Sequence, residues 1–367
     1  MTAAGISLNE LSGNRLSDLC DVVRLGSPTA PREIVEALLG AAGSRPVGAG
    51  PMWPSNVGDD GSPIEFSVAF DSDGVPTLRV LAETTSATPG VGANAAAAEQ
   101  VLRSLGAAHG LSFDKLDRIR DVLLPDEPAG RFGLWTSVIF RRGAAPDFKV
   151  YLDPDAAGPE QAWPRVSRAL ALLGRSDAAD LIARHALRRG ALDHPTFFAL
   201  DLHHRRDARV KVYVSHHDAD ISVAQEAAKA APGTDPEDLA EFHRQLAGDV
   251  ERCPGRPLLS SYSFTRSGLV DYTLYLPIRQ VVADDEHARD RLFTLMAERN
   301  LDTGTLRRAL DAVADRPLRD GVGLIAYVSL RTGPANPGIT VYLSAEAYGV
   351  TPPGDRADHC ARVSRMA

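Results

Sequence analysis

The sequence has few cysteines and no long apolar segment. Its 367 residues include three cysteines, Cys20, Cys253 and Cys360, which are far apart and outside any CxxC spacing. An odd, scattered set of this kind argues against a disulfide framework and a cysteine-based zinc site. No stretch approaches the roughly 18 apolar residues of a membrane span, and residues 1–19 lack the apolar centre of a signal peptide. We therefore expect a cytoplasmic protein that does not bind membranes.

The chain also lacks excess positive charge, and lysine is scarce. It has 40 Lys plus Arg against 48 Asp plus Glu, which gives a net charge of −8 at pH 7. Such a surface has no general attraction for nucleic acid, so any positive cluster is local and suits a small anionic ligand. The four lysines are Lys115, Lys149, Lys211 and Lys229.

The segment Arg209–Ser215 shows what the chain has instead. In a β-strand its side chains alternate, so Arg209, Lys211 and Tyr213 share one face and three valines share the other. A single strand of this kind is typical of a surface strand with a solvated polar face. The recurrence of the pattern along the chain argues against that interpretation.

The recurrence has a regular spacing. Four strand tyrosines are separated by 62, 62 and 67 residues, and a weaker copy, Arg79-Val80-Leu81, ends 70 residues before the first of them. This spacing indicates five copies of one supersecondary unit. Two of the lysines, Lys149 and Lys211, precede a strand tyrosine by two residues, and a compact ammonium group suits phosphate oxygens. The tyrosines are Tyr151, Tyr213, Tyr275 and Tyr342.

Each unit is predicted to be a hairpin joined to the next by helices. Apolar spacing and turn residues predict strands at 63–70, 77–83, 133–141, 148–152, 196–202, 209–214, 258–265, 272–278, 323–330 and 339–344. The first hairpin turn is predicted at 71–74. Helices are predicted within 7–43, with a break at Pro28–Pro31, and within 92–109, 159–189, up to about 250, and 285–315.

Hairpins joined by helices give an antiparallel sheet with its helices on one side, and ten strands favour closure because an open sheet leaves edges. We predict an α+β fold: a ten-stranded antiparallel β-barrel surrounded by α-helices, built from five hairpins with helices between them. The repeat core covers about 60–350 after an N-terminal helical segment at 7–43. Because the repeat spans nearly the whole chain, we expect one domain, 1–367.

A barrel of this size has a lumen that can hold a ligand. Arg79, Lys149, Arg209 and Lys211 would point into it, and desolvating each ion costs several kcal/mol unless an anion or water meets it. The tyrosines beside them offer π faces, each worth about 0.5–2 kcal/mol towards a cation. Cations and aromatic faces together suggest a reaction in which an anion leaves a carbocation.

Five ordered motifs carry a family resemblance: PIEFSVAF with TLRVLAE, FKVYLDP, ARVKVYV, SYSFT with YTLYLPIR, and GVGLIAY with ITVYLSAEAY. Over roughly residues 60–350 the chain resembles the aromatic prenyltransferases of the dimethylallyltryptophan synthase type, in particular the bacterial indole-prenylating members. The resemblance implies the prenyltransferase (ABBA) barrel, a ten-stranded antiparallel barrel built from five α-β-β-α repeats. It also implies that dimethylallyl diphosphate ionises in the lumen and that an indole ring attacks the allyl cation. No metal cofactor is implied, because basic side chains take its place.

The resemblance also implies roles for single residues. Glu65 would accept a hydrogen bond from the indole N–H, and Thr273 stands where fungal relatives commonly have glutamine. The diphosphate-binding residues implied are Arg79, Lys149, Arg209 and Lys211. The shield that protects the allyl cation from water is implied to be Tyr151, Tyr213, Tyr275 and Tyr342. The base that rearomatises the ring is unassigned, and three nearby histidines are more typical of a solvated turn: His194, His203 and His204.

Three other motifs favour structural roles. Asp284–Ala288 is similar to an aspartate-rich magnesium motif, but Ala288 replaces the expected third aspartate, so we predict the acidic first turn of a helix. Asp59-Asp60-Gly61 is predicted to be a turn before the first strand. Gly90–Asn94 lacks the remaining glycine and the Lys-Ser/Thr ending of a P-loop.

The predicted function is metal-independent transfer of a dimethylallyl group from dimethylallyl diphosphate to the indole ring of tryptophan, or of a tryptophan-derived compound, in secondary metabolism. One alternative is prenylation of a phenolic acceptor. Another is a non-catalytic barrel that binds an anionic aromatic metabolite, which would have no use for the Glu65 carboxylate. The acceptor, the position and mode of attachment, the prenyl chain length and the oligomeric state stay open at this point.

Overall fold

The ten predicted strands form one closed antiparallel barrel. The computed structural model describes residues 5–71, 74–231, 233–253, 255–333 and 337–354. The strands follow chain order around the barrel, and the circle closes where the first strand pairs with the tenth. The predicted fold is therefore confirmed. The strands are β1 (Ile64–Asp71), β2 (Thr77–Ala82), β3 (Leu134–Phe140), β4 (Asp147–Leu152), β5 (Asp193–Asp201), β6 (Val210–His216), β7 (Leu258–Thr265), β8 (Gly268–Leu276), β9 (Ile325–Thr332) and β10 (Gly338–Ser344).

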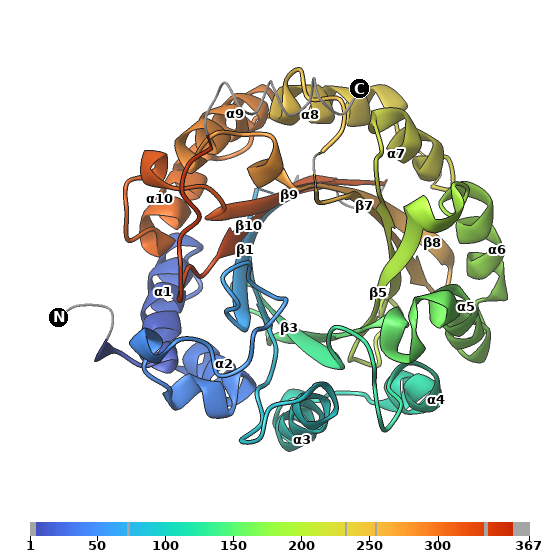
Figure 1. The fold of residues 1–367 in the computed structure, drawn as a ribbon, viewed down its shortest axis with the longest axis horizontal. Coiled ribbons are helices and arrows are strands. Elements are labelled where there is room, and N and C mark those ends of the chain that lie inside the picture. The colour runs from blue at the N-terminus through green and yellow to red at the C-terminus, as the bar shows by residue number, and fades with distance from the viewer. Residues whose placement is uncertain (1–4, 72–73, 232, 254, 334–336, 355–367) are drawn as a thin grey trace.

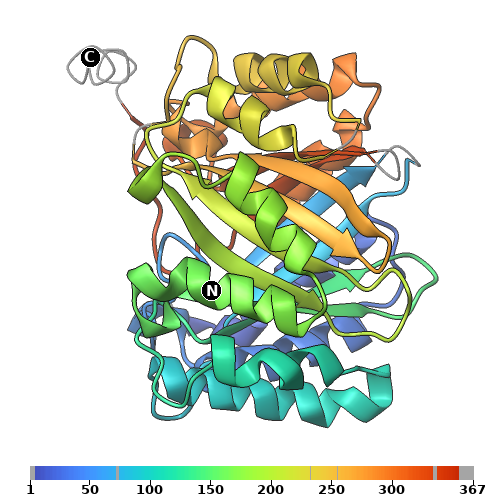
Figure 2. The same cartoon turned by 90° about the vertical axis from the view of Figure 1, so that its right-hand side faces the viewer.

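The helices form a ring outside the barrel, as the view along the barrel shows (Figure 1). From the side, helices of this ring lie across the outer face of the strands (Figure 2). Two α-helices precede each hairpin, so the described chain has the order α-α-β-β five times. Each of the first four hairpins, taken with the helix before it and the helix after it, has the predicted α-β-β-α order. They are α1 (Leu8–Val22), α2 (Thr29–Leu39), α3 (Val91–His109), α4 (Asp114–Leu123), α5 (Ala162–Leu172), α6 (Ser176–His185), α7 (Ile221–Ala228), α8 (Pro236–Ala247), α9 (Asp285–Glu298) and α10 (Thr303–Val313).

The main hydrophobic core lies between the strands and this ring of helices. Val212 and Val214 of β6 are fully buried, and they belong to the same core as Phe242 and Leu246 of α8. Each fully buried side chain of this size contributes about 1.5–3 kcal/mol relative to exposure. The alternation in Arg209–Ser215 thus has the predicted consequence: the valines face the helices, and the polar side chains face the lumen.

Two helical features differ from the prediction. The helical segment is interrupted at residues 23–27, before Pro28, whereas Pro31 lies in the first turn of α2. Proline is tolerated there because the first N–H groups of a helix have no intrahelical partner. The short helix α4 was not predicted, although Leu116 and Ile119 on its buried face are spaced as in an amphipathic helix.

Strand ends differ from the predicted ones by up to four residues. The largest shift is at β8, which begins at Gly268 because its hairpin with β7 continues to the turn. Strand β5 begins at Asp193, and its register with β6 shifts between Pro195 and Phe197. In the first hairpin turn, residues 72–73 lie outside the described residues. Cys20 and Cys253 are free thiols, and Cys360 lies outside the described part of the chain.

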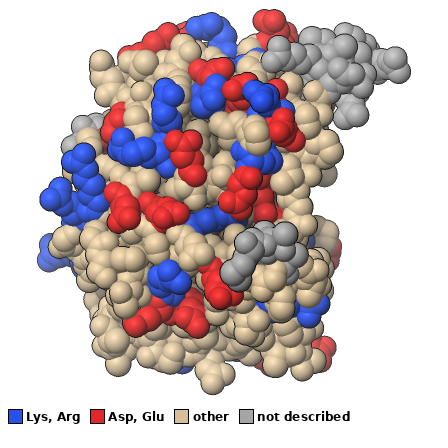
Figure 3. All heavy atoms as spheres, turned by 90° about the vertical axis from the view of Figure 1, so that its left-hand side faces the viewer, with Lys and Arg blue, Asp and Glu red and all other residues tan. Residues whose placement is uncertain are grey.

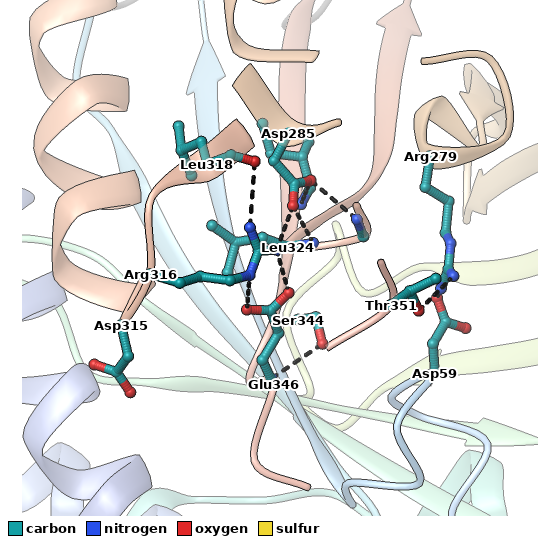
Figure 4. Close-up of polar contacts among 12 residues, drawn as sticks. Asp59, Arg279, Asp285, Asp315, Arg316, Leu318, Leu324, Ser344, Glu346 and Thr351 are labelled. Atoms are coloured by element: carbon teal, nitrogen blue, oxygen red, sulfur yellow. Dashed lines mark hydrogen bonds and ion pairs between the residues drawn. The ribbon is translucent and has the colours of Figure 1, made fainter. Parts of the chain in front are cut away.

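The acidic motif at residues 284–288 is the first turn of a helix, as predicted. Asp284 is the N-cap of α9 and accepts a hydrogen bond from the His287 N–H at 2.7 Å. Asp285 is fully buried and accepts hydrogen bonds from the backbone N–H groups of Gly323 and Ile325 at 3.0 and 3.1 Å. It also accepts a hydrogen bond from the Arg316 guanidinium (Figure 4). This carboxylate therefore ties α9 to the start of β9. Among the described residues, no group of His, Cys, Asp or Glu is arranged to hold a metal ion.

The exterior is mixed in charge. On the face that carries α1 and α10, acidic and basic side chains are interspersed (Figure 3). Within the described residues, no helix has both the length and the apolar character needed to cross a membrane.

Candidate active site

The inward faces of the strands line two cavities that share the four strand tyrosines. The larger cavity, about 790 Å³, lies at the end of the barrel that carries the hairpin turns, and we call it the basic chamber. The smaller, about 160 Å³, lies on the other side of the tyrosines, and we call it the aromatic chamber. Basic residues that line the basic chamber are Arg79, Arg141, Arg142, Lys149, Arg205, Arg206, Arg209, Lys211 and Arg331, and its acidic residues are Asp71, Asp147, Asp201, Asp207 and Asp271. The aromatic chamber includes Glu65, Leu81, Trp135, Phe197, Arg256 and Tyr327.

The Asp201 carboxylate positions two cations of the basic chamber. Asp201 of β5 lies opposite Lys149 of β4 in register, and its oxygens lie 3.4 Å from Lys149 Nζ and 2.8 Å from Arg209 Nε. It also accepts the backbone N–H of Arg209 at 3.0 Å. Although burial alone would raise it, the pKa of Asp201 is held well below its usual range by these two cations. Asp201 therefore stays charged and holds both cations in position.

The surroundings of Lys149 and Lys211 disfavour the charged form of both side chains. Burial, and then repulsion from Arg209 and Arg79, lowers the pKa of Lys149 to about 8 although Asp201 opposes this. Burial and the cations around it, Lys149 first, hold the pKa of Lys211 well below its usual value. An anion in the chamber would relieve both effects, because it adds opposite charge where water is largely excluded. The basic chamber is therefore built for a multiply charged anion.

The four tyrosines form a layer between the chambers. Neighbouring ring centroids are 5.8, 5.7 and 6.0 Å apart in the order Tyr151, Tyr213, Tyr275 and Tyr342. Burial raises the pKa of Tyr151 to about 12 and that of Tyr213 well above the usual value, so these two phenols are neutral at physiological pH. Neutral aromatic faces in a dry layer can stabilise a carbocation that water would otherwise quench.

Glu65 of β1 supplies a partly buried carboxyl group to the aromatic chamber. Phe132 stacks on Trp135 with centroids 3.9 Å apart, and Phe197 lies 5.6 Å from Trp135, so the walls are flat and apolar. Burial in these surroundings raises the pKa of Glu65 to about 8. A carboxyl group beside flat aromatic walls can orient a planar heteroaromatic ring that carries an N–H donor.

Comparison with known families agrees with this geometry. A family model described as tryptophan dimethylallyltransferase matches residues 32–308 of the chain. The chain belongs to the tryptophan dimethylallyltransferase family. This membership confirms the resemblance found in the sequence motifs.

Solved structures of similar proteins share this barrel. The 6-dimethylallyltryptophan synthase of Micromonospora olivasterospora, in complex with DMASPP and Trp, is 44% identical, with 95% of this chain and 100% of that chain covered and a TM-score of 0.92. The prenyltransferase PriB, in a ternary complex with L-tryptophan and dimethylallyl thiolodiphosphate, is 36% identical (95% and 99% covered, TM-score 0.87). The 5-dimethylallyl tryptophan synthase of Streptomyces coelicolor, also with DMASPP and Trp, is 32% identical (96% and 99% covered, TM-score 0.87).

In this tryptophan dimethylallyltransferase family member, the predicted site residues divide between the two chambers. The four predicted diphosphate ligands line the basic chamber, Glu65 lines the aromatic chamber, and the tyrosines line both. Thr273 also lines the basic chamber. The residues brought together are Glu65, Arg79, Lys149, Arg209, Lys211, Tyr151, Tyr213, Tyr275 and Tyr342.

Several lining residues were missed by the sequence analysis. Arg331 of β9 lines the basic chamber and pairs with Asp71 at the end of β1. The strand was predicted to end at residue 330, but Arg331 continues the inward alternation of Tyr327 and Ser329. Asp201 lies at the end of its strand, and no sequence pattern around it indicates that it lines the chamber. Trp135 lies within the predicted strand 133–141, and no role was predicted for it.

The three histidines have different environments. His204 is exposed, as expected for a turn, and His194 Nε2 lies 2.7 Å from Asp155 Oδ1. His203 differs from the expectation, because its side chain is only 12% exposed and lines the basic chamber. Burial, and then Arg205, lowers the pKa of His203, so the imidazole is mainly neutral at pH 7.

A Ser-His-Asp arrangement lies in the barrel wall but is closed to solvent. His216 Nδ1 is 2.8 Å from Asp193 Oδ1, and His216 Nε2 is 3.0 Å from Ser260 Oγ. Ser260 also bonds the Tyr272 hydroxyl at 2.7 Å, and Tyr272 donates to the Ala224 carbonyl of α7. Because His216 and Ser260 are buried on the outer face of the barrel, this network joins the wall to α7 and does not form a hydrolase site.

The lowered lysine pKa values predict proton uptake when an anion binds. At pH 8 the Lys149 ammonium, with a pKa of about 8, is about half neutral. A bound diphosphate raises this pKa, so protons are taken up, and binding weakens as the pH rises above 8. Titration calorimetry with inorganic diphosphate at pH 8, in buffers of different ionisation enthalpy, measures the uptake.

Inorganic diphosphate also gains or loses protons near pH 8, so a reference protein is needed to separate its contribution from that of Lys149. The Lys149→Arg variant is this reference, because arginine is already charged at pH 8. The wild type is expected to take up about half a proton more than the variant. Identical buffer dependence in the two proteins would exclude Lys149 as the titrating group.

Proposed function

We propose that this protein transfers a dimethylallyl group from dimethylallyl diphosphate to the indole ring of tryptophan. The observation that supports this most directly is the division of the lumen: cations at one end, a carboxyl group at the other, and a tyrosine layer between them. Its relatives with bound DMASPP and Trp support both substrates.

The reaction begins in the basic chamber. The bond between the allylic carbon and the diphosphate oxygen breaks, and the electron pair leaves with the diphosphate. Arg79, Lys149, Arg209 and Lys211 are proposed to neutralise the charge that develops on the leaving group, which is the role a metal ion would otherwise fill. These fixed cations act without solvent reorganisation because Asp201 holds two of them in position.

The allyl cation is then held in the tyrosine layer. A ring carbon of the indole attacks it and forms the new C–C bond, which leaves positive charge on the indole. Glu65 is proposed to accept a hydrogen bond from the indole N–H and to stabilise the positive charge on the ring. Loss of the proton from the attacked carbon restores aromaticity, so the products are prenyltryptophan, diphosphate and one proton.

Two further proposals concern the whole chain. Residues 1–367 are proposed to form one domain, because β1 near the start pairs with β10 near the end and closes the barrel. The protein is proposed to act in the cytoplasm, in secondary metabolism; the free Cys20 and Cys253 support a reducing compartment.

The test is incubation of the purified protein with dimethylallyl diphosphate and L-tryptophan, with and without EDTA, followed by mass spectrometry. We expect a product heavier than tryptophan by one C5H8 unit, formed at the same rate in EDTA. A product formed only with a phenolic acceptor would favour the phenolic alternative. The absence of product with every aromatic tested would favour a binding protein.

A further inference from the structure

The basic chamber continues outward beyond the four cations assigned to the diphosphate. Four further arginines line this outer part. Arg141 and Arg142 belong to the turn between β3 and β4, and Arg205 and Arg206 belong to the turn between β5 and β6. None of them has a part in the proposed stabilisation of the leaving group. Their position at the mouth of an anion pocket therefore requires its own explanation.

Strand β4 orders the lining of the chamber from the mouth inward. Its inward face carries Asp147, then Lys149, then Tyr151, and successive side chains on one face of a strand lie about 7 Å apart. Asp147 is half-buried, and Lys149 is buried. We call Asp147, Asp207 and the four turn arginines the outer level, and the four cations assigned to the diphosphate the inner level. A diphosphate group that enters past the hairpin turns meets the outer level first.

The outer level is arranged like the inner level. One carboxylate oxygen of Asp147 accepts a hydrogen bond from Arg141 at 2.6 Å, and the other accepts one from Arg205 at 2.9 Å. Although burial alone would raise it, these hydrogen bonds hold the pKa of Asp147 below its ordinary value. Asp147 therefore stays charged and holds two guanidinium groups at the mouth, much as Asp201 holds two cations inside.

The hairpins do not depend on these side-chain contacts. Ile139 of β3 pairs with Asp147 of β4 along the backbone. The Leu202 N–H donates to the Phe148 carbonyl at 2.8 Å, so β4 and β5 are joined by the backbone close to their turns. A purely structural role for Arg141 and Arg205 as clips between the turns is thus already filled.

The outer arginines have N–H donors available for a ligand. The side chains of Arg141 and Arg205 are 41% and 55% exposed, and their ion pairs engage only part of the five donors of each guanidinium. Arg142 and Arg206 are exposed, and within the described residues they have no ion-pair partner. A planar guanidinium fork matches phosphate oxygens in pairs. The outer level can therefore contact a phosphate group before the inner level does.

The outer level also carries much of the local positive charge. In a chain of net charge −8, attraction for an anion has to be local. Nine basic and five acidic side chains line the basic chamber, which is an excess of four positive charges. The outer level has four of the basic and two of the acidic side chains, so half of this excess lies at the mouth. Charge of one sign at the mouth of a cleft raises the rate at which an opposite charge arrives.

His203 lies beside both levels. Its ring lines the chamber, and its Nε2 atom is 3.9 Å from the Asp201 carboxylate of the inner level. Its Nδ1 atom is buried and has no hydrogen-bond partner in the described part of the chain. An imidazole N–H can donate to a phosphate oxygen. An anion that moves from the outer level to the inner level would therefore find a polar partner on its way.

We propose that the outer level is a capture site for the diphosphate group of the donor. Its four arginines bind this group on arrival and pass it to the inner level, and they receive inorganic diphosphate when it leaves. The ligand class is a diphosphate monoester or free diphosphate, and no bond is made or broken at the outer level. This inference rests on the proposed prenyl transfer and adds the route by which the donor reaches the same site.

The test is the salt dependence of kcat/KM for dimethylallyl diphosphate at saturating tryptophan. In Arg205→Gln this quantity should fall roughly three- to tenfold at an ionic strength of about 0.01 M, where charges act over about 30 Å. The difference from the wild type should shrink below about twofold near 1 M, where they act over about 3 Å. The loss should fall on KM, because the inner level still surrounds the reacting bond. Arg205→Lys keeps the charge and should stay within about twofold of the wild type.

Arg252→Gln is the matched control. The Arg252 side chain is 54% exposed, pairs with two aspartates, Asp218 and Asp220, and does not line the basic chamber. This variant removes the same charge from the whole protein, and its kcat/KM should stay within about twofold of the wild type at every ionic strength.

Two results would overturn the proposal: equal losses in Arg252→Gln and Arg205→Gln, or a loss in Arg205→Gln that persists at high salt and in Arg205→Lys. The second result would favour a structural role for the guanidinium. If the wild type prenylates tryptophan and Arg205→Gln matches it at every ionic strength, this inference fails alone. If the wild type prenylates no indole, the proposed function fails and takes this inference with it.

Discussion

Replacing Lys211 with methionine is expected to lower kcat/KM for dimethylallyl diphosphate by roughly 10²- to 10³-fold, the usual loss when one preorganised charged donor is removed. Lys211 is buried in the basic chamber, and its ammonium lies 5.3 Å from the ring centroid of Tyr213. Its charge therefore acts beside the tyrosine layer, where little water screens it. Methionine keeps most of the length of the side chain but removes the charge.

The same variant is expected to be more stable than the wild type. Burial and neighbouring cations lower the pKa of Lys211 in the folded protein, so the charged form is disfavoured by folding. This penalty is present at pH 7 and disappears only as the pH rises through the unfolded-state value of about 10.4. Removing the amine at pH 7 removes the penalty. Lower activity with higher stability is the pattern of a residue kept for function.

Steady-state kinetics at saturating tryptophan and thermal unfolding at pH 7 measure the two effects. Lys229→Met is the matched control, because Lys229 is exposed after α7 and its ammonium pairs with nearby Glu226 at 2.5 Å. It should change neither quantity appreciably. Full turnover in Lys211→Met would remove Lys211 from the mechanism.

The barrel was predictable because its signals are local and repeated. An alternation of period two in Arg209–Ser215 fixes which side chains can share a face, and four further copies fix the number of hairpins. Helix α4 was missed because ten residues with six charged side chains give a weak apolar pattern. Strand ends were imprecise because pairing with a neighbour, as in β7 and β8, decides where a strand stops.

The lumen residues were only partly predictable. Lys149 and Lys211 share a motif with a tyrosine, but Asp201 meets Lys149 through a register that only strand pairing defines. Asp59 was correctly predicted to be in a turn, yet its partners Arg256 and Arg279 lie about two hundred residues later in the chain. Contacts of this kind form only when the barrel closes, so no local sequence pattern predicts them.

Replacing Glu65 with glutamine is the second change expected to have a large effect. The amide keeps an oxygen that can accept the indole N–H, but it carries no charge to stabilise the cationic ring. We expect kcat to fall by roughly 10²- to 10³-fold. Glu83→Gln is the matched control, because the Glu83 carboxyl is buried, bonds Ser55 and does not line the aromatic chamber. Its effect on kcat should be less than about tenfold.

The pH profile gives an independent test of Glu65. Burial raises its pKa to about 8, so the group is mainly protonated below that pH, and it must lose its proton before it can act as a carboxylate. At saturating donor, where bound diphosphate keeps the lysines charged, kcat/KM for tryptophan should rise about tenfold per pH unit below 8 and level off above it. Glu65→Gln should abolish this rise, and Glu83→Gln should retain it. A rise that persists in Glu65→Gln would assign the titration to another group and leave Glu65 as a neutral hydrogen-bond partner of the indole.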